Sequence, residues 1–576
     1  MITLVTLPPS GPGCTISNAV ASDAKVSGLC SAPGSLSIPV EYRSIAPLLI
    51  LGIAALVVLG LSATLPKRRY PGLWAGLTFA AGLGTAVDGV VQWVNLNTAA
   101  NTNITVGGQV LYDHFSAFFA ILFGCATALG ALMSDGYLGR EGLDGPEPYV
   151  LMLLCSAGGV LMAEAAGLIT LFLGLEVLSI SLYTMTAYHR RRAASGEAGL
   201  KYFILGSFSS ALFIYGAALV YGATGSTQYY EIFRFLTSTA IAHNGILLAG
   251  MAFLIAGLGF KVAAVPFHFW TPDVYQGAPT PFVGYMAAVA KAAGFAGLLR
   301  VLMLALPTEV ANWRPAIWVL ATASVLVGSV LALAQSDLKR LLAYSSISQV
   351  GYVLIGLQAG TQAGWSAASF YLFTYTFMVL GTFAVVGVIQ GRGEVRNDLG
   401  ALRGLAGRSP WLAASMLVLL LAQAGVPLTS GFLGKWVVIS AVIGKGQYGL
   451  ALIGMLGAAI AAFIYLRLAL LMYMPAVTAA GVRAAEAGVR AAPGGQGVAG
   501  GPGEAEEGAE DLEAMATAGL AARGAVVALR APSSARLRVP TATAAVLAVC
   551  VAFTVFAGVS SPVLSLAHSI GLTWAP

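Results

Sequence analysis

Apolar segments about 20 residues long recur throughout this chain of 576 residues, and they constrain its fold more than any other feature. A helix needs about 20 mainly apolar residues to cross the hydrocarbon core of a bilayer. Only 9% of the residues are charged and 58% are hydrophobic, so most of the chain cannot face water. Backbone polar groups inside a bilayer must be satisfied internally, which favours helices. The sequence therefore predicts an all-α, polytopic membrane protein.

The positions of these segments predict about fourteen membrane-spanning helices. A group of three comes first, ten more follow, and one stands apart near the C-terminus. The predicted spans are 44–65, 72–95, 112–133, 147–165, 167–188, 197–222, 244–268, 279–304, 314–335, 339–359, 364–390, 409–442, 447–474 and 540–566.

Two segments depart from this pattern. Residues 1–43 are rich in Ser, Pro and Gly and lack the basic start and apolar core of a signal peptide, so we expect an extramembrane N-terminal arm. Residues 476–539 mix Gly, Ala, Glu and Arg without aromatic residues and cannot bury enough apolar surface to order themselves. We expect a flexible cytoplasmic insertion there, and an acidic docking segment is the alternative.

Basic residues collect in short loops, and their bias predicts the orientation of the chain. With fourteen spans, the basic loops all fall on one side, which the rule makes cytoplasmic, so both termini lie outside the cell membrane. The formal net charge of +6 follows from these loops and does not indicate a nucleic acid partner. The loops are Pro66–Tyr70, His189–Arg192, Asp337–Arg340 and Arg392–Arg408.

Redox and metal chemistry find no support in the sequence. The five cysteines form no Cys-x-x-Cys motif and no Cys/His cluster, which argues against iron–sulfur, haem-attachment and zinc sites. No glycine-rich nucleotide loop follows a predicted strand. We therefore expect no catalytic residue, no bound cofactor and no metal in this chain.

Four charged residues form a set near the middle of the membrane, namely Glu176, Lys261, Lys291 and Lys435. Lys261 is the one full charge between Gly245 and Phe269, and an ammonium group at membrane depth costs about 2.5–3.5 kcal/mol even on the lenient insertion scale. Glu176 and Lys291 lie near the middle of their spans. The alternatives are a lysine that snorkels to the headgroups and a static buried ion pair.

Two of the lysines stand beside predicted helix breaks. Pro266 follows Lys261 closely, and Pro427 precedes Lys435 within a Gly- and Pro-containing stretch. Broken helices at membrane depth are tolerated where they line a cavity, and paired breaks in two halves of a chain indicate an ion path. A fainter repeat relates the segments that begin at Glu197 and Asp337.

These charges suggest a proton relay, because three lysines and one glutamate cannot be paired one to one. Burial favours a neutral lysine, and a nearby carboxylate favours the charged one, so moving the carboxylate changes the proton occupancy of the lysine. We predict the relay residues to be Glu176, Lys261, Lys291 and Lys435.

Four further residues are interpreted more simply. His268 and Lys201 are candidate relay or proton-uptake residues, against a structural histidine and a snorkelling lysine as alternatives. Lys339 begins its helix, so we interpret it as a snorkelling or orientation charge. Glu164 lies near the end of its span, so we expect an interfacial residue.

The run FKVAAVPFHFWTPDVYQGAPT at 260–280, together with SDLKRLLAYSSISQVGY at 336–352, resembles the antiporter-like membrane subunits of respiratory complex I. The similarity covers about residues 110–475. Within this family, the DVYQGAPT form at 273–280 and the lysine at Lys435 resemble the subunit N type. The subunit L and M types and the Mrp cation/proton antiporters usually differ at these positions.

The resemblance implies two inverted five-helix repeats, helices 4–8 (147–304) and 9–13 (314–474), with helices 7 and 12 interrupted. Helices 1–3 (44–133) precede the repeats and helix 14 (540–566) follows them. The four predicted relay residues match the family's helix-5 glutamate and its helix-7, helix-8 and helix-12 lysines.

The resemblance also implies membership of a translocase, the proton-pumping NADH:quinone oxidoreductase. Other subunits would hold NADH, FMN, iron–sulfur clusters and quinone. The partners would be the lipid bilayer and neighbouring membrane subunits of the M, K and A/J types. The rival hypotheses are an Mrp-type cation/proton antiporter subunit and a structural membrane scaffold.

Overall fold

The computed structural model of the chain describes residues 40–65, 72–99, 103–239, 244–475 and 537–559. Most of the predicted N-terminal arm, most of the predicted insertion at 476–539 and the end of the last predicted span lie outside the described residues.

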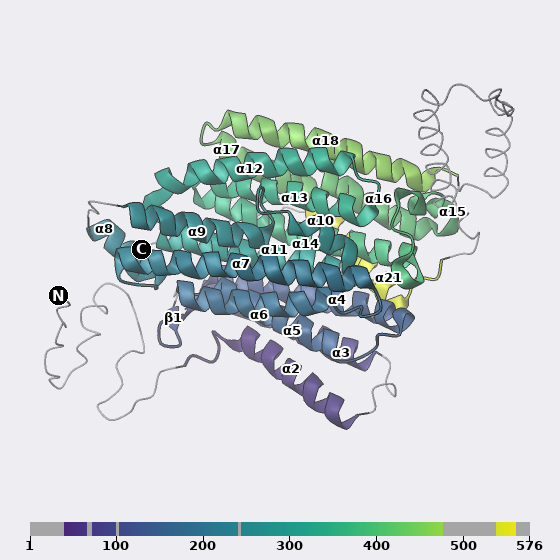
Figure 1. Cartoon of the computed structure of the whole chain (residues 1–576), viewed down its shortest axis with the longest axis horizontal. Helices are drawn as coiled ribbons and strands as arrows, with labels where there is room; N and C mark the ends of the chain where they lie inside the picture. The colour runs from purple at the N-terminus through teal and green to yellow at the C-terminus, as the bar shows by residue number, and fades with distance from the viewer. Residues whose placement is uncertain (1–39, 66–71, 100–102, 240–243, 476–536, 560–576) are drawn as a thin grey trace, which may run out of the picture.

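Long helices lying side by side make up the described chain (Figure 1). Thirteen of them are long and apolar enough to cross a membrane, and each coincides with a predicted span. The predicted span 409–442 is divided into two shorter helices, α16 and α17. The elements are α2 (Ala46–Thr64), α3 (Leu73–Ala99), β1 (Asn103–Thr105), β2 (Val110–Tyr112), α4 (His114–Glu141), α5 (Glu147–Glu164), α6 (Leu168–Thr186), α7 (Ala193–Thr224), α8 (Tyr229–Ser238), α9 (Gly245–Val262), α10 (Trp270–Gly277), α11 (Thr280–Arg300), α12 (Val310–Leu333), α13 (Leu338–Gln358), α14 (Gln362–Gln390), α15 (Leu405–Arg408), α16 (Pro410–Ala424), α17 (Ser430–Ile443), α18 (Tyr448–Tyr473) and α21 (Thr541–Val559).

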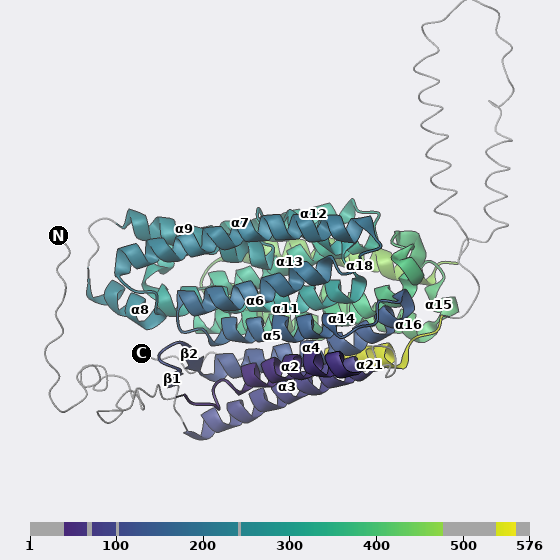
Figure 2. The ribbon, with the colours of Figure 1, turned by 60° about the horizontal axis from the view of Figure 1, so that its bottom comes forward.

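Two groups of five spans form the body of the bundle. We call α5 to α11 the first half and α12 to α18 the second half, and α9–α10 and α16–α17 each count as one span. Because five crossings separate α5 from α12, the two halves enter the membrane from opposite sides, so their topology is inverted. The helices α11, α13 and α14 are the most deeply buried and lie at the centre of the bundle (Figure 2).

Both predicted helix breaks are confirmed. The helix α9 ends before Ala263, whose φ of 63° is left-handed, and α10 begins only at Trp270. The helix α16 ends before Gly425, whose φ is 91°, and α17 begins at Ser430. Each half of the bundle therefore contains one span with non-helical backbone inside it.

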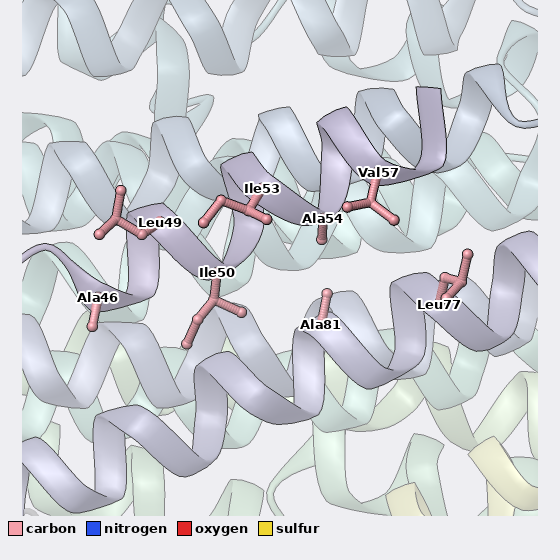
Figure 3. Close-up of a pocket in the computed structure, with 8 residues that line it drawn as sticks. All are labelled: Ala46, Leu49, Ile50, Ile53, Ala54, Val57, Leu77 and Ala81. Atoms are coloured by element: carbon pink, nitrogen blue, oxygen red, sulfur yellow. The ribbon is translucent and has the colours of Figure 1, made fainter. Parts of the chain in front are cut away.

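A groove between α2 and α3 shows how apolar the outer surface is (Figure 3). Every residue that lines it is aliphatic, so lipid tails can cover this face without leaving a polar group unsatisfied. The lining residues are Ala46, Leu49, Ile50, Ile53, Ala54, Val57, Leu77 and Ala81.

Close backbone contact fixes α6 against α5. A Cβ atom on Gly158 would lie 2.6 Å from the backbone nitrogen of Leu178 and 2.7 Å from the carbonyl oxygen of Gly174. Small residues allow such backbone approach between membrane helices. This contact sets the position of α6, which carries Glu176.

We expect Gly158→Ala to lower the thermal stability of the protein, because the added methyl group meets backbone that cannot move aside. Overpacking of this kind costs about 1–3 kcal/mol. The measurement is thermal unfolding in detergent, with Gly196→Ala on α7 as the control, since a Cβ atom there meets nothing within 4 Å. Equal melting temperatures for the two variants would contradict the close contact.

Candidate functional site

Lys261 lies in the last turn of α9, with only 3% of its surface exposed. Its Nζ donates a hydrogen bond of 2.8 Å to the Ser179 hydroxyl on α6. The rings of Tyr183 and Tyr202 have their centroids 5.8 and 5.7 Å from the same nitrogen, which is within range of a cation–π contact. A hydroxyl and two aromatic faces therefore hold this ammonium group.

Glu176 lies on α6, three residues before Ser179 and thus on the same side of the helix. Its Oε1 is buried and has no hydrogen-bond partner among the described residues. Within the same part of the chain, no ion pair joins Glu176 to Lys261. Glu176 therefore lies close to the Ser179 that binds Lys261, but it makes no ion pair with the lysine.

Lys291 lies in the middle of α11, the central helix of the bundle, and is 2% exposed. Its Nζ donates to the Ser346 carbonyl at 3.0 Å and to the hydroxyl of the same residue. The ring of Tyr275 lies 5.9 Å away. This second lysine is likewise held by neutral groups.

Lys435 lies in α17 and is 4% exposed. Its Nζ donates to the carbonyl oxygens of Gln423 and Ala424 at 2.8 and 3.0 Å. These are the last carbonyls of α16, where the helix dipole places partial negative charge. The helix break thus supplies the acceptors for this ammonium group.

A chain of side chains extends from the Lys291 site to the Lys435 site. Ser345, next to the serine that Lys291 contacts, shares a hydrogen bond with the Tyr465 hydroxyl on α18. The Tyr465 hydroxyl in turn lies 3.4 Å from Oε1 of Gln423. Through Gln349, the Tyr465 hydroxyl is also linked to the Gln423 backbone carbonyl, which accepts from Lys435. Hydrogen bonds therefore lead from Ser345 to Lys435, and no hydrogen bond among the described residues joins Ser345 to Ser346, the serine that Lys291 contacts.

Gln349 on α13 orients this chain. Its Nε2 donates to the Tyr465 hydroxyl at 3.1 Å and to the Gln423 carbonyl at 3.3 Å. Its Oε1 accepts from the Tyr371 hydroxyl. Thr382 adds a contact of 2.7 Å to the Gln423 amide. These contacts therefore fix the position of the Tyr465 hydroxyl.

Sequence reasoning missed three residues of this chain, namely Gln349, Gln423 and Tyr465. A signal existed for Gln423, since an amide ends an apolar run directly before a predicted break. Gln349 directly follows the serine cluster of α13. Tyr465 gave no signal, because a tyrosine is unremarkable in an apolar helix.

The chain is interrupted between Lys261 and Lys291. The stem of Lys261 packs against Gly294 on α11, where a Cβ atom would lie 3.3 Å from the lysine Cβ. Gly294 is one helical turn from Lys291. Within the described residues, no series of hydrogen bonds connects the two lysines, although Lys261 packs against the helix that carries Lys291.

The two candidate uptake residues have different surroundings. Lys201 has a side chain that is 45% exposed, and it pairs with Asp273 at 3.0 Å and Glu197 at 2.8 Å. His268 lies in the break after α9 and is 6% exposed. Its Nδ1 has no hydrogen-bond partner in the part of the chain that the structure describes.

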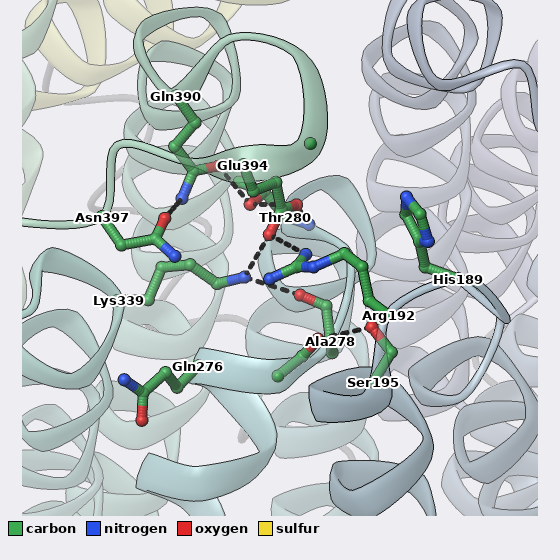
Figure 4. A network of polar contacts seen from close by, with 12 residues as sticks. His189, Arg192, Ser195, Gln276, Ala278, Thr280, Lys339, Gln390, Glu394 and Asn397 are labelled. Carbon is green, nitrogen blue, oxygen red and sulfur yellow. Dashed lines mark hydrogen bonds and ion pairs between the residues drawn. The ribbon is translucent and has the colours of Figure 1, made fainter.

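Lys339 corrects the sequence interpretation, because it does not snorkel. Its side chain is fully buried, and Nζ donates to the Ala278 carbonyl at 2.6 Å and to Oε2 of Glu394 at 3.0 Å (Figure 4). Arg192 at the start of α7 also points at Glu394, with its Nη1 2.5 Å from the same oxygen. A buried carboxylate between two cations replaces the expected surface charge.

Glu394 also accepts hydrogen bonds from the backbone N–H and the hydroxyl of Thr280, at 2.8 and 2.7 Å, at the start of α11. Burial alone would raise its pKa, but the charges of Lys339 and Arg192 and the bonds from Thr280 lower the pKa to about 2. Glu394 therefore stays ionised at physiological pH. It ties the loop after α14 to the first half.

The described residues contain no group of three or more His, Cys, Asp or Glu that could hold a metal ion. The site consists instead of isolated ammonium groups, hydroxyls and amides. Such groups can bind and pass protons, since hydroxyls donate and accept and lysine exists in two protonation states.

Comparison with known proteins gives consistent matches. Residues 165–461 match the family model described as NADH:quinone oxidoreductase/Mrp antiporter, TM. NADH-quinone oxidoreductase subunit N of Trichlorobacter lovleyi is 41% identical over 434 residues, which cover 75% of this chain and 88% of that protein.

Two solved structures are also similar. A chain of respiratory complex I from Thermus thermophilus with bound aureothin has a TM-score of 0.66 and 31% identity, covering 90% of this chain and 98% of that one. A chain of the Mrp complex from Dietzia sp. has a TM-score of 0.74 over 92% of this chain and 97% of that one. Its identity is 20%, so this likeness concerns the fold alone.

Proposed function

Because the chain belongs to the subunit N family of NADH-quinone oxidoreductases, the antiporter-like membrane subunits of respiratory complex I, we propose that it translocates protons through buried lysines while the complex reduces quinone. Glu176, Lys261, Lys291 and Lys435 carry the protons in this proposal. Lys201 and His268 are candidates for uptake.

One observation carries the proposal. Three ammonium groups are buried in the bundle, and neutral groups supply the hydrogen bonds described for each of them. An ammonium group at membrane depth costs about 2.5–3.5 kcal/mol, and a fixed ion pair is the usual structural remedy. Lysines without such pairs can lose and regain a proton at moderate cost, which suits a relay.

The contacts between Lys291 and Lys435 support the same function. Hydroxyl groups donate and accept hydrogen bonds, so Ser345 and Tyr465 can pass a proton by exchanging roles. Gln349 and Gln423 hold the Tyr465 hydroxyl between the two lysines. The proposed path runs along the centre of the bundle.

Tyr465→Phe is expected to weaken proton pumping while leaving the fold intact, because it removes the hydroxyl and keeps the ring. Losing one buried hydrogen-bond partner costs about 1–3 kcal/mol. We expect the pumping rate to fall by roughly 5- to 150-fold, the factor that a cost of 1–3 kcal/mol makes. The measurement is acidification in proteoliposomes during quinone reduction by the intact complex.

Tyr352→Phe is the matched control. It removes an equally buried hydroxyl, which donates to the Gly454 carbonyl at 2.8 Å, and it keeps the ring beside Lys435. If Tyr465→Phe pumps as well as this control, the path through Tyr465 is wrong.

The assembly and orientation of the chain are part of the proposal. The chain is a multi-pass membrane protein. We place it in the cell membrane, with its basic loops in the cytoplasm, both termini outside and subunits of the M, K and A/J types as neighbours. We propose that other subunits hold every redox cofactor.

Mass spectrometry of the subunits that co-purify from native membranes tests the proposed assembly. A chain that purifies without other subunits would contradict that assembly.

A further inference from the structure

Glu164, the last residue of α5, is a buried acid outside the proposed relay. The sequence predicted an interfacial residue, but its side chain is completely buried. Neither carboxylate oxygen has a hydrogen-bond partner within the described residues. Burying a charge without a partner costs far more than burying a neutral group. A structural role through hydrogen bonds therefore does not explain why a carboxyl group stands at this buried position.

The neighbouring cation is already neutralised. Arg300, the last residue of α11, donates from Nη1 and Nη2 to the two oxygens of Asp113 at 2.6 and 2.8 Å. Its Nε donates to the Ala163 carbonyl, beside Glu164, at 2.7 Å. Burial would raise the pKa of Asp113, but Arg300 and Ser116 outweigh it and lower that pKa. Asp113 thus neutralises the charge of Arg300, and Glu164 lies beside this ion pair without joining it.

Other buried polar atoms without partners lie near this end of α5. Ala165 pairs with Val110 of the β-hairpin, and the Ala166 carbonyl accepts from the Tyr229 N–H at 3.0 Å. The hydroxyls of Tyr229 and of Tyr112, two residues beyond Val110, are buried without partners in the described chain. Water commonly satisfies such groups in proteins.

This polar region extends to α3. Asp88 on α3 is half-buried, and no hydrogen bond joins it to Glu164 within the described residues. Gln92 donates from its Nε2 to Asp88 and to the Arg43 carbonyl, each at 2.9 Å. These hydrogen-bonded groups of α3 therefore reach the start of α2, at the end of the bundle opposite to Glu394.

An apolar layer separates this region from Lys261. The stem of Lys261 lies against Gly294, and Arg300 is six residues further along α11, or about 9 Å. Gly297 lies between them. A Cβ atom there would meet Leu171, Met162 and Leu258 at 2.8, 3.3 and 3.4 Å, so these side chains fill the space between the two polar regions.

We propose that Glu164 is a proton-binding residue at the end of the relay of the first half. When water enters the apolar layer, it carries one proton from protonated Lys261 to the Glu164 carboxylate, which leaves a neutral amine and a neutral carboxylic acid. The acid then releases that proton to water on the side of the bundle where Asp88 lies. This step deepens the proposed function and rests on it.

Infrared difference spectroscopy of the intact complex during turnover tests this step. A carboxylic acid that gains and loses a proton gives a C=O stretching signal that shifts in heavy water. We expect this signal in the wild type, its loss in Glu164→Gln and a shifted signal in Glu164→Asp. We also expect fewer protons pumped per quinone reduced in Glu164→Gln. Glutamine resembles the neutral acid in shape, so the variant is expected to assemble.

Glu231→Gln is the control, because this glutamate lies on α8 and is exposed. It should change neither the infrared signal nor the pumping. An unchanged signal together with wild-type pumping in Glu164→Gln would overturn the role of Glu164, and so would a signal that Glu164→Asp does not shift. Failure of the relay itself is distinguishable, since normal pumping in Lys261→Ala would overturn the proposed function whatever the Glu164 variants do.

Discussion

Replacing Lys261 by alanine is expected to abolish proton translocation through this subunit while the protein still inserts and assembles. The ammonium group is held by the Ser179 hydroxyl and two tyrosine rings, so its removal leaves no buried charge unpaired. The relay, however, loses the group that carries its proton. Assembly and translocation should therefore respond differently to this change.

Lys261→Arg is also expected to pump poorly. A guanidinium group keeps its proton at all accessible pH values, so it preserves the charge and removes the exchange. A static ion pair with Glu176 predicts the reverse order, with arginine nearly normal and alanine poorly assembled, because breaking a buried pair costs about 3–5 kcal/mol.

Proton pumping and quinone reduction in proteoliposomes, together with native gels for assembly, distinguish the two accounts. Lys445→Ala serves as the control, since this lysine is exposed after α17. A Lys261→Arg variant that pumps at the wild-type level would exclude a relay role for Lys261. An assembled alanine variant that pumps normally would remove the residue from the path.

Glu394→Gln should destabilise the protein more than any other single change of charge described above. The carboxylate lies between Lys339 and Arg192 with no exposed surface, so glutamine leaves the buried Lys339 and the partly buried Arg192 without their anion. Breaking such a buried arrangement costs about 3–5 kcal/mol. We expect a markedly lower melting temperature and less assembled complex.

The same substitution should alter the dependence of stability on pH. The pKa of Glu394 in the folded chain is about 2, below its ordinary value of 4.5. The stabilisation is therefore present above pH 4.5 and is lost as the pH falls toward 2. Thermal unfolding across this interval should show the loss in the wild type and not in Glu394→Gln.

Glu197→Gln provides the comparison, because its ion pair with Lys201 is at the surface, with the glutamate side chain 66% exposed. Exposed pairs contribute only about 0–1 kcal/mol. A similar loss of stability in both variants would show that the Glu394 cluster is not a buried anchor.

Local signals explain why the spans and breaks could be predicted. Apolar length identifies a membrane helix without knowledge of its neighbours, and Pro266 and Pro427 mark interruptions within a few residues. The burial of Lys261 and Lys435 beside these breaks follows from the same local reasoning. Their part in proton transfer stays a prediction.

Contacts between distant segments explain what could not be predicted. Lys339 has the sequence position of a snorkelling lysine, yet Glu394, 55 residues further on, covers it. Tyr465 and Gln349 meet across 116 residues, and Asp113 and Arg300 across 187. Nothing in the neighbouring sequence indicates these partners.

The division of one span into α16 and α17 has a consequence for biogenesis. With 15 and 14 residues, neither piece is long enough to be inserted as an independent span, which takes about 20 residues. The Gln423 and Ala424 carbonyls at the break need the Lys435 ammonium group as a donor, and Lys435 needs these carbonyls. We therefore expect the two pieces to insert together, as one span, and to depend on the neighbouring helices for a stable position in the membrane.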